Sequence, residues 1–424
     1  MATTSSAGSD AERVLAQVWR QEAPRVLAAL LRRHGDLGDC EDAAQEAAEA
    51  AVVQWSATGV PGDPGAWLVR VASRRLIDRH RSDRARERRE IEDSARESAD
   101  AVAPSVAEVP PSSGHDDTLR MLFLCCHPSL SRPSQVALSL RAVAGLSVES
   151  IAAAYLVPAR TMTQRLTRAR SALRAAGARF EMPSSAQLPA RTAAVLDACH
   201  LMFTEGYTQT SGDTLLDLTL AEEAIRLVRQ VREVLVDHDE ASGLLALMLL
   251  THARSPARTD EAGDLVPLAE QDRGRWREDL IDEGVSVLEQ VLPRGAVGRY
   301  QLHAAIAAVH AEATAYAATD WWQIRVLYEM LTEVAPSPAV ALNRAVAVAM
   351  TDGPAAGLAV LGVAGPAMAR HHRWHAVRAH LLELDGDLGA AAEAYRQAAR
   401  LTSSRPEQRY LNRRLLRLDG GSSS

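Results

Sequence analysis

Residues Leu140 to Leu173 read "LRAVAGLSVESIAAAYLVPARTMTQRLTRARSAL", and this stretch indicates how the chain folds. Ser147 is a typical N-cap, so a helix is predicted from there to about Tyr155 or Leu156. The dipeptide "VP" interrupts the helical pattern, and Pro158 suits the first turn of a second helix. Two helices joined by so short a turn are typical of a helix-turn-helix unit.

The second helix of this unit has two chemically different faces. At 100° per residue, its apolar side chains fall within one narrow stripe. The stripe consists of Met162, Leu166, Ala169 and Leu173. The polar surface consists of Arg160, Thr163, Gln164, Thr167, Arg168 and Ser171, flanked by Arg165, Arg170 and Arg174. It contains no acid, and Arg and Gln can bind base edges while Thr binds phosphates, so it is predicted to read DNA. An ordinary basic surface helix is the alternative.

The composition extends the helical prediction to the whole chain. A length of 424 residues allows about two to four domains. Apolar residues make up 47% of the chain and aromatic residues only 4%, so the cores must be built mainly from Ala, Leu and Val. Such residues, with few breakers outside a few clusters, favour helices over sheets. We therefore predict an all-α, multidomain fold.

Charge is distributed unevenly along the chain. The formal net charge is −7, which by itself argues against a general nucleic-acid binder. Residues 70–89 are nevertheless strongly basic, residues 90–117 are strongly acidic, and residues 160–174 are basic again. Local basic patches of this kind can contact phosphates in a protein that is acidic overall.

The N-terminal stretch "MATTSSAGSD" lacks the basic start and the apolar core of a secretory signal. The longest apolar run, "LLALMLL", is far shorter than the roughly 20 residues of a membrane span. We therefore expect a cytoplasmic protein that does not interact with a membrane. In that compartment its four cysteines are expected to be reduced thiols.

The C-terminal part contains a repeat. The stretch "AVALNRAVAVAMTDGPAAGLAVL" is followed 33 residues later by "HRWHAVRAHLLELDGDLGAAAEAY", which aligns Asp352 and Gly353 with Asp385 and Gly386. Each copy has the pattern of a helix, a glycine turn and a second helix. This period is typical of tetratricopeptide repeats. Two unrelated helical hairpins are the alternative.

Several stretches resemble a known family. "GLSVESIAAAYLVPARTMTQRLTRARSALR" resembles region 4 of bacterial sigma factors of the extracytoplasmic-function group. "DCEDAAQEA" followed by "GAWLVRVASRRLIDRHR" resembles their region 2. The remainder, from Leu188 to Leu418, resembles the extension of one subgroup that ends in tetratricopeptide repeats, in segments such as "EQDRGRWREDLIDEG" and "YQLHAAIAAVHAEA". The resemblance covers nearly the whole chain.

This resemblance implies a sequence of five segments. They are sigma region 2 (10–89), an acidic flexible linker (90–117), sigma region 4 with the helix-turn-helix (118–178), a helical domain (188–335) and tetratricopeptide-like repeats (336–418). The acidic linker suits either of two roles. It can thread the positively charged cleft of a polymerase, or it can serve as a solvated tether.

The resemblance also implies roles for individual residues. The set that binds core polymerase at its clamp helices consists of Glu41, Asp42, Gln45 and Glu46. The set that binds promoter DNA consists of Arg74, Arg75, Arg79 and Arg81 at the minus-ten region, and Arg160, Thr161, Thr163, Gln164, Arg165 and Arg168 at the minus-thirty-five element. Most members have Asn where this chain has Arg74, and Arg where it has Ser73, so the promoter sequence stays open.

The stretch "MLFLCCHPSL" is a candidate metal or redox site. Adjacent cysteines diverge by 100° on a helix, whereas a zinc site prefers a C-x2–4-C spacing. We instead predict that Leu122, Cys125 and Cys126 pack beneath the helix-turn-helix. His127 is expected to carry a charge that suits the helix end, and Pro128 to stop the helix. A redox role for the cysteine pair stays open.

Three histidines lie close together in the C-terminal part, at His371, His372 and His375. Two of them have the i, i+4 spacing of metal ligands on one helix face. No H-E-x-x-H pattern or obvious acidic third ligand accompanies them, so we interpret them as surface or packing residues. A metal site is the alternative, and we expect neither a metal nor another cofactor.

These observations together predict a transcription initiation factor, not an enzyme. It would bind RNA polymerase core and promoter DNA, and its extension would support or control this activity through an unidentified protein or ligand on the repeats. One alternative is a helix-turn-helix regulator that acts without the polymerase. Another is a metal-dependent hydrolase built on the C-terminal helices.

Overall fold

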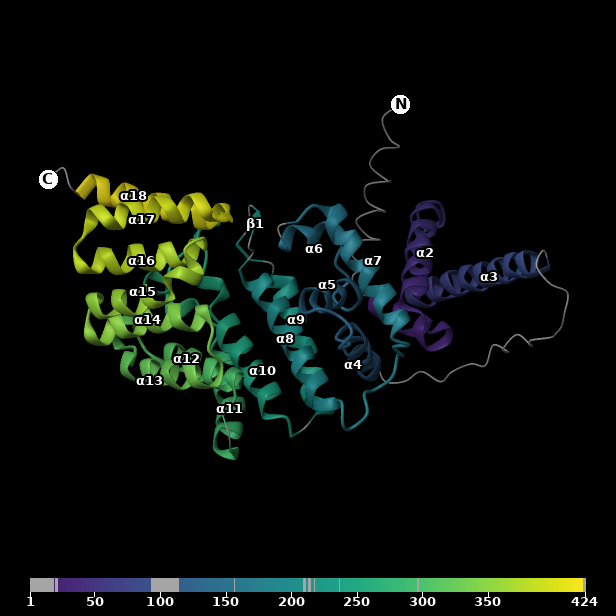
Figure 1. The fold of residues 1–424 in the computed structure, drawn as a ribbon, viewed down its shortest axis with the longest axis horizontal. Coiled ribbons are helices and arrows are strands. Elements are labelled where there is room, and N and C mark those ends of the chain that lie inside the picture. Colours follow the sequence, from purple (N-terminus) through teal and green to yellow (C-terminus); the bar gives the residue numbers. More distant parts are fainter. Residues whose placement is uncertain are drawn as a thin grey trace, which may run out of the picture. The chain divides into compact units, whose positions relative to one another are not determined.

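The computed structural model describes residues 19, 22–92, 114–155, 157–208, 211–212, 215–216, 218–235, 237–295 and 297–421. This part of the chain is almost entirely helical (Figure 1), which confirms the all-α prediction. It divides into two compact units. The first runs up to Ala198, apart from 153–156, and the second begins at Cys199 and includes 153–156.

The first unit contains the elements predicted for regions 2 and 4. They are a helix over 22–34, α2 (Leu37–Thr58), α3 (Pro64–Glu92), α4 (Gly114–Cys125), α5 (Arg132–Ala142), α6 (Val148–Ala154), α7 (Ala159–Ala175) and the first part of α8 (Leu188–Tyr207). Helices α6 and α7 begin directly after Ser147 and Pro158, as the sequence predicted. The backbone N–H of Ser150 donates to the Ser147 hydroxyl at 3.1 Å, so Ser147 is the N-cap.

Helix α2 packs on α3 through small residues. Its buried stripe includes Cys40, Ala43, Ala44, Ala47, Ala51 and Trp55. Such small side chains allow close approach, and the stripe ends in a larger contact, where the rings of Trp55 and Trp67 meet edge to face with centroids 5.4 Å apart. At the other end, the Asp36 carboxylate accepts from the backbone N–H of Asp39 at 2.9 Å and caps the helix. The exposed face of α2 is therefore held in a fixed direction.

The segment predicted as region 4 (118–178), called region 4 below for short, is built around the apolar stripe of α7. Met162, Leu166, Ala169 and Leu173 are all buried, which confirms the predicted stripe. Helix α4 supplies much of the remaining core, since its entire run from Met121 to Cys125 is buried. The outward direction of the other α7 face follows from this packing.

The second unit is a longer array of helices. It contains the last part of α8, then β1 (Ser211–Gly212), α9 (Leu218–Val234), α10 (Asp239–His252), α11 (Glu278–Val291), α12 (Arg299–Glu312), α13 (Trp321–Val334), α14 (Pro338–Asp352), α15 (Pro354–Met368), α16 (His372–Asp385), α17 (Leu388–Leu401), β2 (Ser403–Ser404) and α18 (Arg405–Gly421). Short 3-10 helices occupy Ser255–Ala257, Leu268–Glu270, Arg273–Arg275, Leu292–Arg294 and Tyr316–Ala318.

The two predicted repeats form helical hairpins, α14 with α15 and α16 with α17 (Figure 1). The aligned glycines sit in the turns. Gly353 has φ 93° and Gly386 has φ 88°, a region that glycine enters without steric cost. The shared Asp-Gly pattern thus corresponds to the same structural position in both hairpins.

The end of the second unit contacts the beginning of the same unit. Strand β1, which follows α8, pairs in parallel with β2, which precedes α18. Asp264, in the loop between α10 and α11, forms ion pairs with Arg409 and with Arg413, the latter at 3.0 Å. The buried Arg258 donates to the Tyr207 carbonyl oxygen and stacks on the Tyr207 ring at 3.7 Å. The end of the repeats is therefore joined to the start of the extension, which the sequence did not predict.

Some predicted boundaries fall on residues that the structure does not describe. The linker was expected at 90–117, but α3 extends to Glu92 and α4 begins at Gly114, and residues 93–113 lie outside the described part. Residues 10–18 of the predicted region 2 also lie outside it. The expected start of the extension at Leu188 is the start of α8, whereas the compact units divide within that helix.

The closure of the second unit predicts a stability effect. Asp264→Asn removes the charge that holds Arg409 and Arg413, and the carboxylate is only 11% exposed. Both arginines are partly solvated, so we expect a loss of about 1–2 kcal/mol in the free energy of unfolding. Urea denaturation measures this free energy of unfolding. Asp279→Asn, at an exposed pair with Arg277, is the matched control and should change the free energy of unfolding much less than Asp264→Asn does. Equal effects of the two variants would contradict the closure.

Candidate nucleic-acid interface

The outward face of α7 is exposed and free of acids. Arg160, Thr161, Thr163, Gln164, Thr167 and Arg168 are exposed, whereas Arg165 is half-buried. The hydroxyls of Thr163 and Thr167 donate to backbone carbonyls one turn earlier, at 3.0 and 2.9 Å. Their oxygens keep lone pairs for donors but offer no free proton to a phosphate. Arg160, Gln164 and Arg168 therefore carry the donors that this face can present to DNA.

The C-terminal arginines of α7 have a different function from the one their sequence position suggested. Arg170 and Arg174 do not extend the outward face but bind the N-terminal part of α2. The Arg170 Nε lies 2.7 Å from the Glu41 Oε2, although the two are not aligned as a hydrogen bond. Arg174 donates to both carboxylate oxygens of Asp36, at 2.6 and 2.7 Å, and to Asp39 at 3.1 Å.

Glu41 is buried, with only 8% of its surface exposed. Besides Arg170, its carboxylate accepts a hydrogen bond at 3.1 Å from the Nε of Arg141, on α5. Arg141 in turn donates to the Leu146 carbonyl oxygen at 2.9 Å. The sequence placed Glu41 in the polymerase-binding set, but in this conformation it faces region 4 and is closed to another protein. A buried charge needs such partners, which is the physical reason for the difference.

The pairing between Asp36 and Arg174 also affects the Asp36 carboxyl. The hydrogen bond from Arg174 lowers the pKa of Asp36 below its ordinary value, against the opposing effect of partial burial. Because the pKa of this carboxyl is lowered in the folded protein, the contact stabilises the fold at pH values above the pKa of the unfolded state. That stability is lost as pH falls through the folded-state pKa. The contact is therefore fully present at neutral pH.

Helix α2 presents a continuous exposed stripe away from region 4. Asp42, Gln45, Glu49 and Val53 are exposed and follow an i, i+3, i+7, i+11 spacing, so they share one face. Val53 has 75% of its surface exposed, so this face ends in an apolar side chain. Sequence reasoning identified the two polar residues but missed Glu49 and Val53, although the same spacing contains them.

The arginines predicted on α3 divide into two pairs. Arg74 and Arg81 are exposed. Arg75 and Arg79 are instead bound to Glu46 of α2, Arg75 at 3.1 Å, and Arg79 also lies 4.0 Å from Asp42. Glu46 thus orients two of the arginines and does not share the freely exposed position of Gln45. The α2 and α3 surfaces are adjacent and linked by charge.

Comparison with known proteins supports the assignment of this first segment. A family model described as Sigma-70 region 2 matches residues 18–86, which contain α2 and most of α3. This match supports a sigma factor. Sigma-70 family factors are transcription initiation factors and not enzymes, and their region 2 binds RNA polymerase core and promoter DNA.

Two further matches concern the extension and the whole chain. Residues 191–292 of the chain match a family of unknown function, DUF6596. The full chain is similar to "Uncharacterized protein R00370" of Rhizobium meliloti (strain 1021), with 38% identity over 392 residues. That alignment covers 92% of this chain and 93% of the relative, so the similarity spans nearly the full length of both.

The adjacent cysteines at the end of α4, Cys125 and Cys126, are packing residues. Cys125 and Cys126 are buried, as the sequence predicted, and all four cysteines are free thiols. Burial raises the pKa of Cys126 to about 12 and also raises that of Cys125. Gln135 donates to the carbonyl oxygens of Cys126 and His127 at 3.3 and 3.1 Å, which satisfies the end of α4. A metal or redox role therefore has no support from this geometry.

His127 differs from the expectation of a charged residue at the helix end. Partial burial lowers its pKa, and the nearby Arg191 lowers it further. Its Nδ1 accepts from the backbone N–H of Ser129 at 3.2 Å. The histidine therefore fits as an uncharged hydrogen-bond acceptor that shapes the turn after α4.

The histidines of the repeats have structural partners. The Nδ1 of His371 accepts from the backbone N–H of Arg373 at 3.2 Å and caps α16. His372 lies 3.4 Å from a carboxylate oxygen of Glu407, and His375 lies 2.8 Å from the Ala369 carbonyl oxygen. Within the residues that the structure describes, no group of three His, Cys, Asp or Glu side chains could hold a metal ion.

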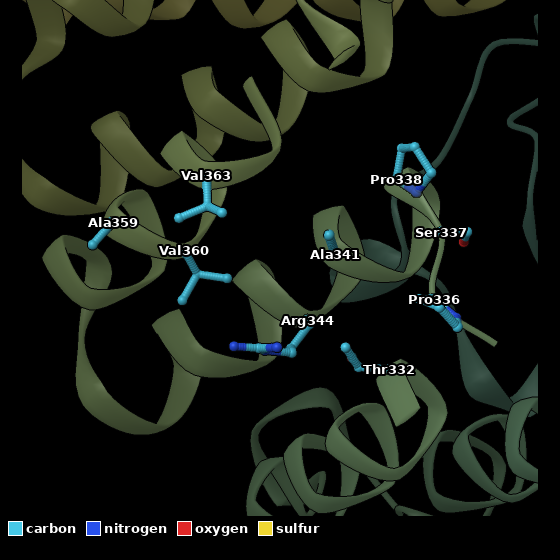
Figure 2. A pocket seen from close by; sticks show the side chains of 9 residues that line it. All are labelled: Thr332, Pro336, Ser337, Pro338, Ala341, Arg344, Ala359, Val360 and Val363. Carbon is cyan, nitrogen blue, oxygen red and sulfur yellow. The ribbon is translucent and has the colours of Figure 1, made fainter. Parts of the chain in front are cut away.

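The repeats contain an apolar cavity of about 660 Å³ between α13, α14 and α15. Figure 2 shows Val360 and Val363 on α15, with Ala341 and Arg344 on α14. The lining is mostly apolar, and Arg344 supplies the one charge among its residues. It carries no pair of groups suited to acid–base or nucleophilic catalysis. Among the described helices, none is both long and apolar enough to cross a bilayer.

Thiol reactivity tests the packing role of the cysteines. Because all four thiols are buried, the native protein should react with a thiol-specific chromogenic reagent at pH 8 at least about a hundred times more slowly than the urea-unfolded protein. Counting released chromophore in both states measures this. Fast reaction of two thiols in the native protein would contradict burial of the Cys125–Cys126 pair.

Proposed function

We propose that this protein is a sigma factor of the extracytoplasmic-function group, which joins RNA polymerase core through α2 and reads promoter DNA with α3 and α7. The observation that carries the proposal is the coexistence of two separate surfaces. One is the exposed stripe of α2 within the segment that matches Sigma-70 region 2, and the other is the acid-free outward face of α7.

The α2 stripe suits a helical partner. Asp42, Gln45, Glu49 and Val53 give one face with polar groups and an apolar contact at its end. A stripe that repeats every three to four residues packs well against another helix. The clamp helices of the polymerase are such a partner, and Asp42 and Gln45 are the residues that the family resemblance assigns to them. Glu41 and Glu46 act indirectly, because both are engaged with arginines of the same chain.

The promoter is contacted at two places. Arg160, Gln164 and Arg168 on α7 carry donors for base edges in the major groove at the minus-thirty-five element. The exposed Arg74 and Arg81 of α3 contact the minus-ten region, with Arg75 and Arg79 released to DNA when Glu46 turns elsewhere. This reading places the protein in the cytoplasm, where the polymerase acts.

The extension serves as a scaffold in this proposal. Helix α8 carries Asp197, which pairs with Arg132 of region 4. The hairpins α14–α15 and α16–α17 resemble tetratricopeptide repeats, and an unidentified protein or ligand would bind them. The alternative is that the extension inhibits the sigma regions until a signal releases it.

A helix-turn-helix regulator that acts without the polymerase is the second candidate function. The face of α7 alone would suit it equally. The match to Sigma-70 region 2 and the exposed α2 stripe favour the sigma factor, because an independent regulator has no use for them.

Core binding tests the role of α2. Asp42→Arg reverses a charge on the exposed stripe, so we expect the loss of at least about 2 kcal/mol of core affinity, roughly thirtyfold. Gln54→Arg, also exposed but turned about 120° away on the same helix, is the control and should bind normally. Fluorescence anisotropy with purified core polymerase gives both affinities. Normal binding by the Asp42 variant would exclude this surface.

Promoter binding tests the role of α7. Replacing Arg160, Gln164 and Arg168 together with Ala should remove about 1–3 kcal/mol of binding free energy for each base-edge contact that is lost. It should also make binding less dependent on salt. Arg396→Ala, at a half-exposed arginine of α17, removes the same kind of charge elsewhere and should have little effect. Holoenzyme binding to a promoter duplex is measured at several salt concentrations. Unchanged promoter binding by the triple variant would contradict the assignment of α7.

Transcription by variants of α18 separates the scaffold from the inhibitor. Removal of residues from Arg405 onwards deletes α18, and Asp264→Asn loosens it without deleting core residues. As a scaffold, the extension must be intact, so both changes should reduce multi-round transcription severalfold. Because the deletion can impair folding, Asp264→Asn is decisive at a temperature where it is fully folded. Higher activity than the unaltered protein would establish inhibition instead.

A further inference from the structure

We propose that the cavity between α13, α14 and α15 binds a small amphipathic carboxylate. The ligand is an aliphatic acid whose apolar body fills the cavity and whose head group pairs with Arg344. The inference names the ligand class of the repeats, and it rests on the proposed function only for its consequence. Binding itself needs neither polymerase nor DNA, so it is measured without them.

The cavity has the size and the lining of a small-molecule site. Its volume of about 660 Å³ lies within the roughly 300–1,000 Å³ that is usual for ligand pockets. Six of its nine lining residues are alanine, valine or proline. Val363, which is 86% exposed, lies where the cavity opens to solvent. An apolar ligand body would therefore be removed from water on most of its surface.

The walls of the cavity are set by the packing of the first repeat hairpin. Near the turn of the hairpin, Gly357 brings α15 so close to α14 that a Cβ there would lie 2.5 Å from the Cβ of Ala349. Further from the turn, α14 presents the small side chain of Ala341 to the cavity. Pro336 and Pro338 restrict the backbone that enters α14. The cavity is therefore formed before a ligand binds.

Arg344 gives the cavity its one charge, and this charge has no counter-ion. No carboxylate is among the described residues that line the cavity, and Arg344 takes part in no ion pair within the described part of the chain. Its Nε is buried without a hydrogen-bond partner. The acids Glu329 and Asp352 of α13 and α14 pair with Arg325 instead. A guanidinium in such a position is stabilised by an anion, and a carboxylate matches its paired donors.

The two hydroxyls of the lining are engaged by the backbone. Thr332 donates to the Tyr328 carbonyl oxygen at 2.7 Å. Ser337 accepts from the backbone N–H of Val340 at 3.2 Å and so caps α14. A polar group in the body of a ligand would therefore lose water and gain little in return. The lining thus favours one charged end and an apolar remainder.

These features give the ligand a direction. Arg344 and Pro338 are about 9 Å apart along α14, and Ala341 lies between them on the same face. In the view of Figure 2, the Arg344 side chain lies between Val360 and Thr332. The carboxylate binds at Arg344, and the aliphatic chain runs past Ala341 toward Pro338.

The volume favours a small molecule over a peptide helix. A helix with its side chains is about 10–12 Å wide and rises 1.5 Å per residue, so about 660 Å³ holds roughly four to six residues, or about one turn. An extended peptide would need partners for its backbone groups, which the lining does not supply. An aliphatic acid meets neither difficulty.

Occupation of the cavity has a consequence for the extension. Helix α13 ends the domain predicted at 188–335, and α14 and α15 form the first repeat hairpin. A ligand that contacts all three helices holds this hairpin to the domain and stabilises the folded state by mass action. In the proposed scaffold, the supply of such an acid would set how rigid the extension is.

Calorimetric titration of the full-length protein tests the site. The probes are sodium hexanoate, octanoate and decanoate, each below its micelle concentration. We expect saturable binding at one site, with an affinity that rises about fourfold for each added CH2 group. The same titration with 1-decanol measures the contribution of the apolar body without a charge.

Two variants separate the head group from the body. Arg344→Gln should weaken decanoate binding at least about tenfold and leave 1-decanol binding unchanged. Ala341→Phe places a ring in the cavity and should abolish binding of both probes. Arg400→Gln, at an exposed arginine of α17, removes the same charge elsewhere and is the control. Circular dichroism confirms that each variant is folded, and Arg344→Gln decides alone if the phenylalanine variant is not.

Three results would overturn the proposal. They are the absence of saturable binding by every acid, uptake without a fixed stoichiometry, and equal decanoate affinities of the Arg344 variant and the unaltered protein. Binding of a leucine-rich amphipathic peptide by a protein that binds none of the acids would also overturn it, in favour of a peptide groove.

The two proposals fail in different ways. If the protein is not a sigma factor, core polymerase does not co-elute with it, but decanoate still binds and still depends on Arg344. If the site is wrong, core polymerase binds, and none of the acids does.

Discussion

A carboxylate that is removed from water must find cations, and Glu41 satisfies this requirement with two arginines from two other helices. This one constraint determines how α2, α5 and α7 meet in the first unit. It places the last turn of α7 against the first turn of α2, and so directs the outward face of α7 away from region 2. It also leaves Asp42 and Gln45 among the exposed polar residues of α2. The candidate surfaces for polymerase and for DNA are the parts of each helix that neither this contact nor the apolar cores cover.

The features that the sequence predicted well are those with local causes. The stripe of Met162, Leu166, Ala169 and Leu173 could be found because helical periodicity alone determines which side chains share a face. The turns at Gly353 and Gly386 could be found because a left-handed turn residue recurs at the same place in both hairpins. The burial of Cys125 and Cys126 followed from their apolar neighbours and the wrong spacing for a metal.

The features that the sequence did not predict depend on distant partners. Arg141 and Glu41 are a hundred positions apart, and nothing in either local pattern says which acid an arginine binds. For the same reason Arg75 and Arg79 were expected to face DNA, whereas Glu46 holds them. The pairing of β1 with β2 joins two-residue strands that have no periodicity to detect. This pairing joins the two ends of the extension. An array of hairpins with joined ends resists the stretching that an open solenoid permits.

The central claim is that this chain gives RNA polymerase core the ability to start at particular promoters. The most direct measurement is transcription from sheared chromosomal DNA of a bacterium that encodes the protein, by purified core polymerase with and without it, followed by mapping of transcript 5′ ends. The account predicts a discrete set of new start sites that share two upstream elements at a fixed spacing, matching two separate DNA-reading helices. The same start sites with and without the protein, while it binds DNA fragments alone, would contradict the account.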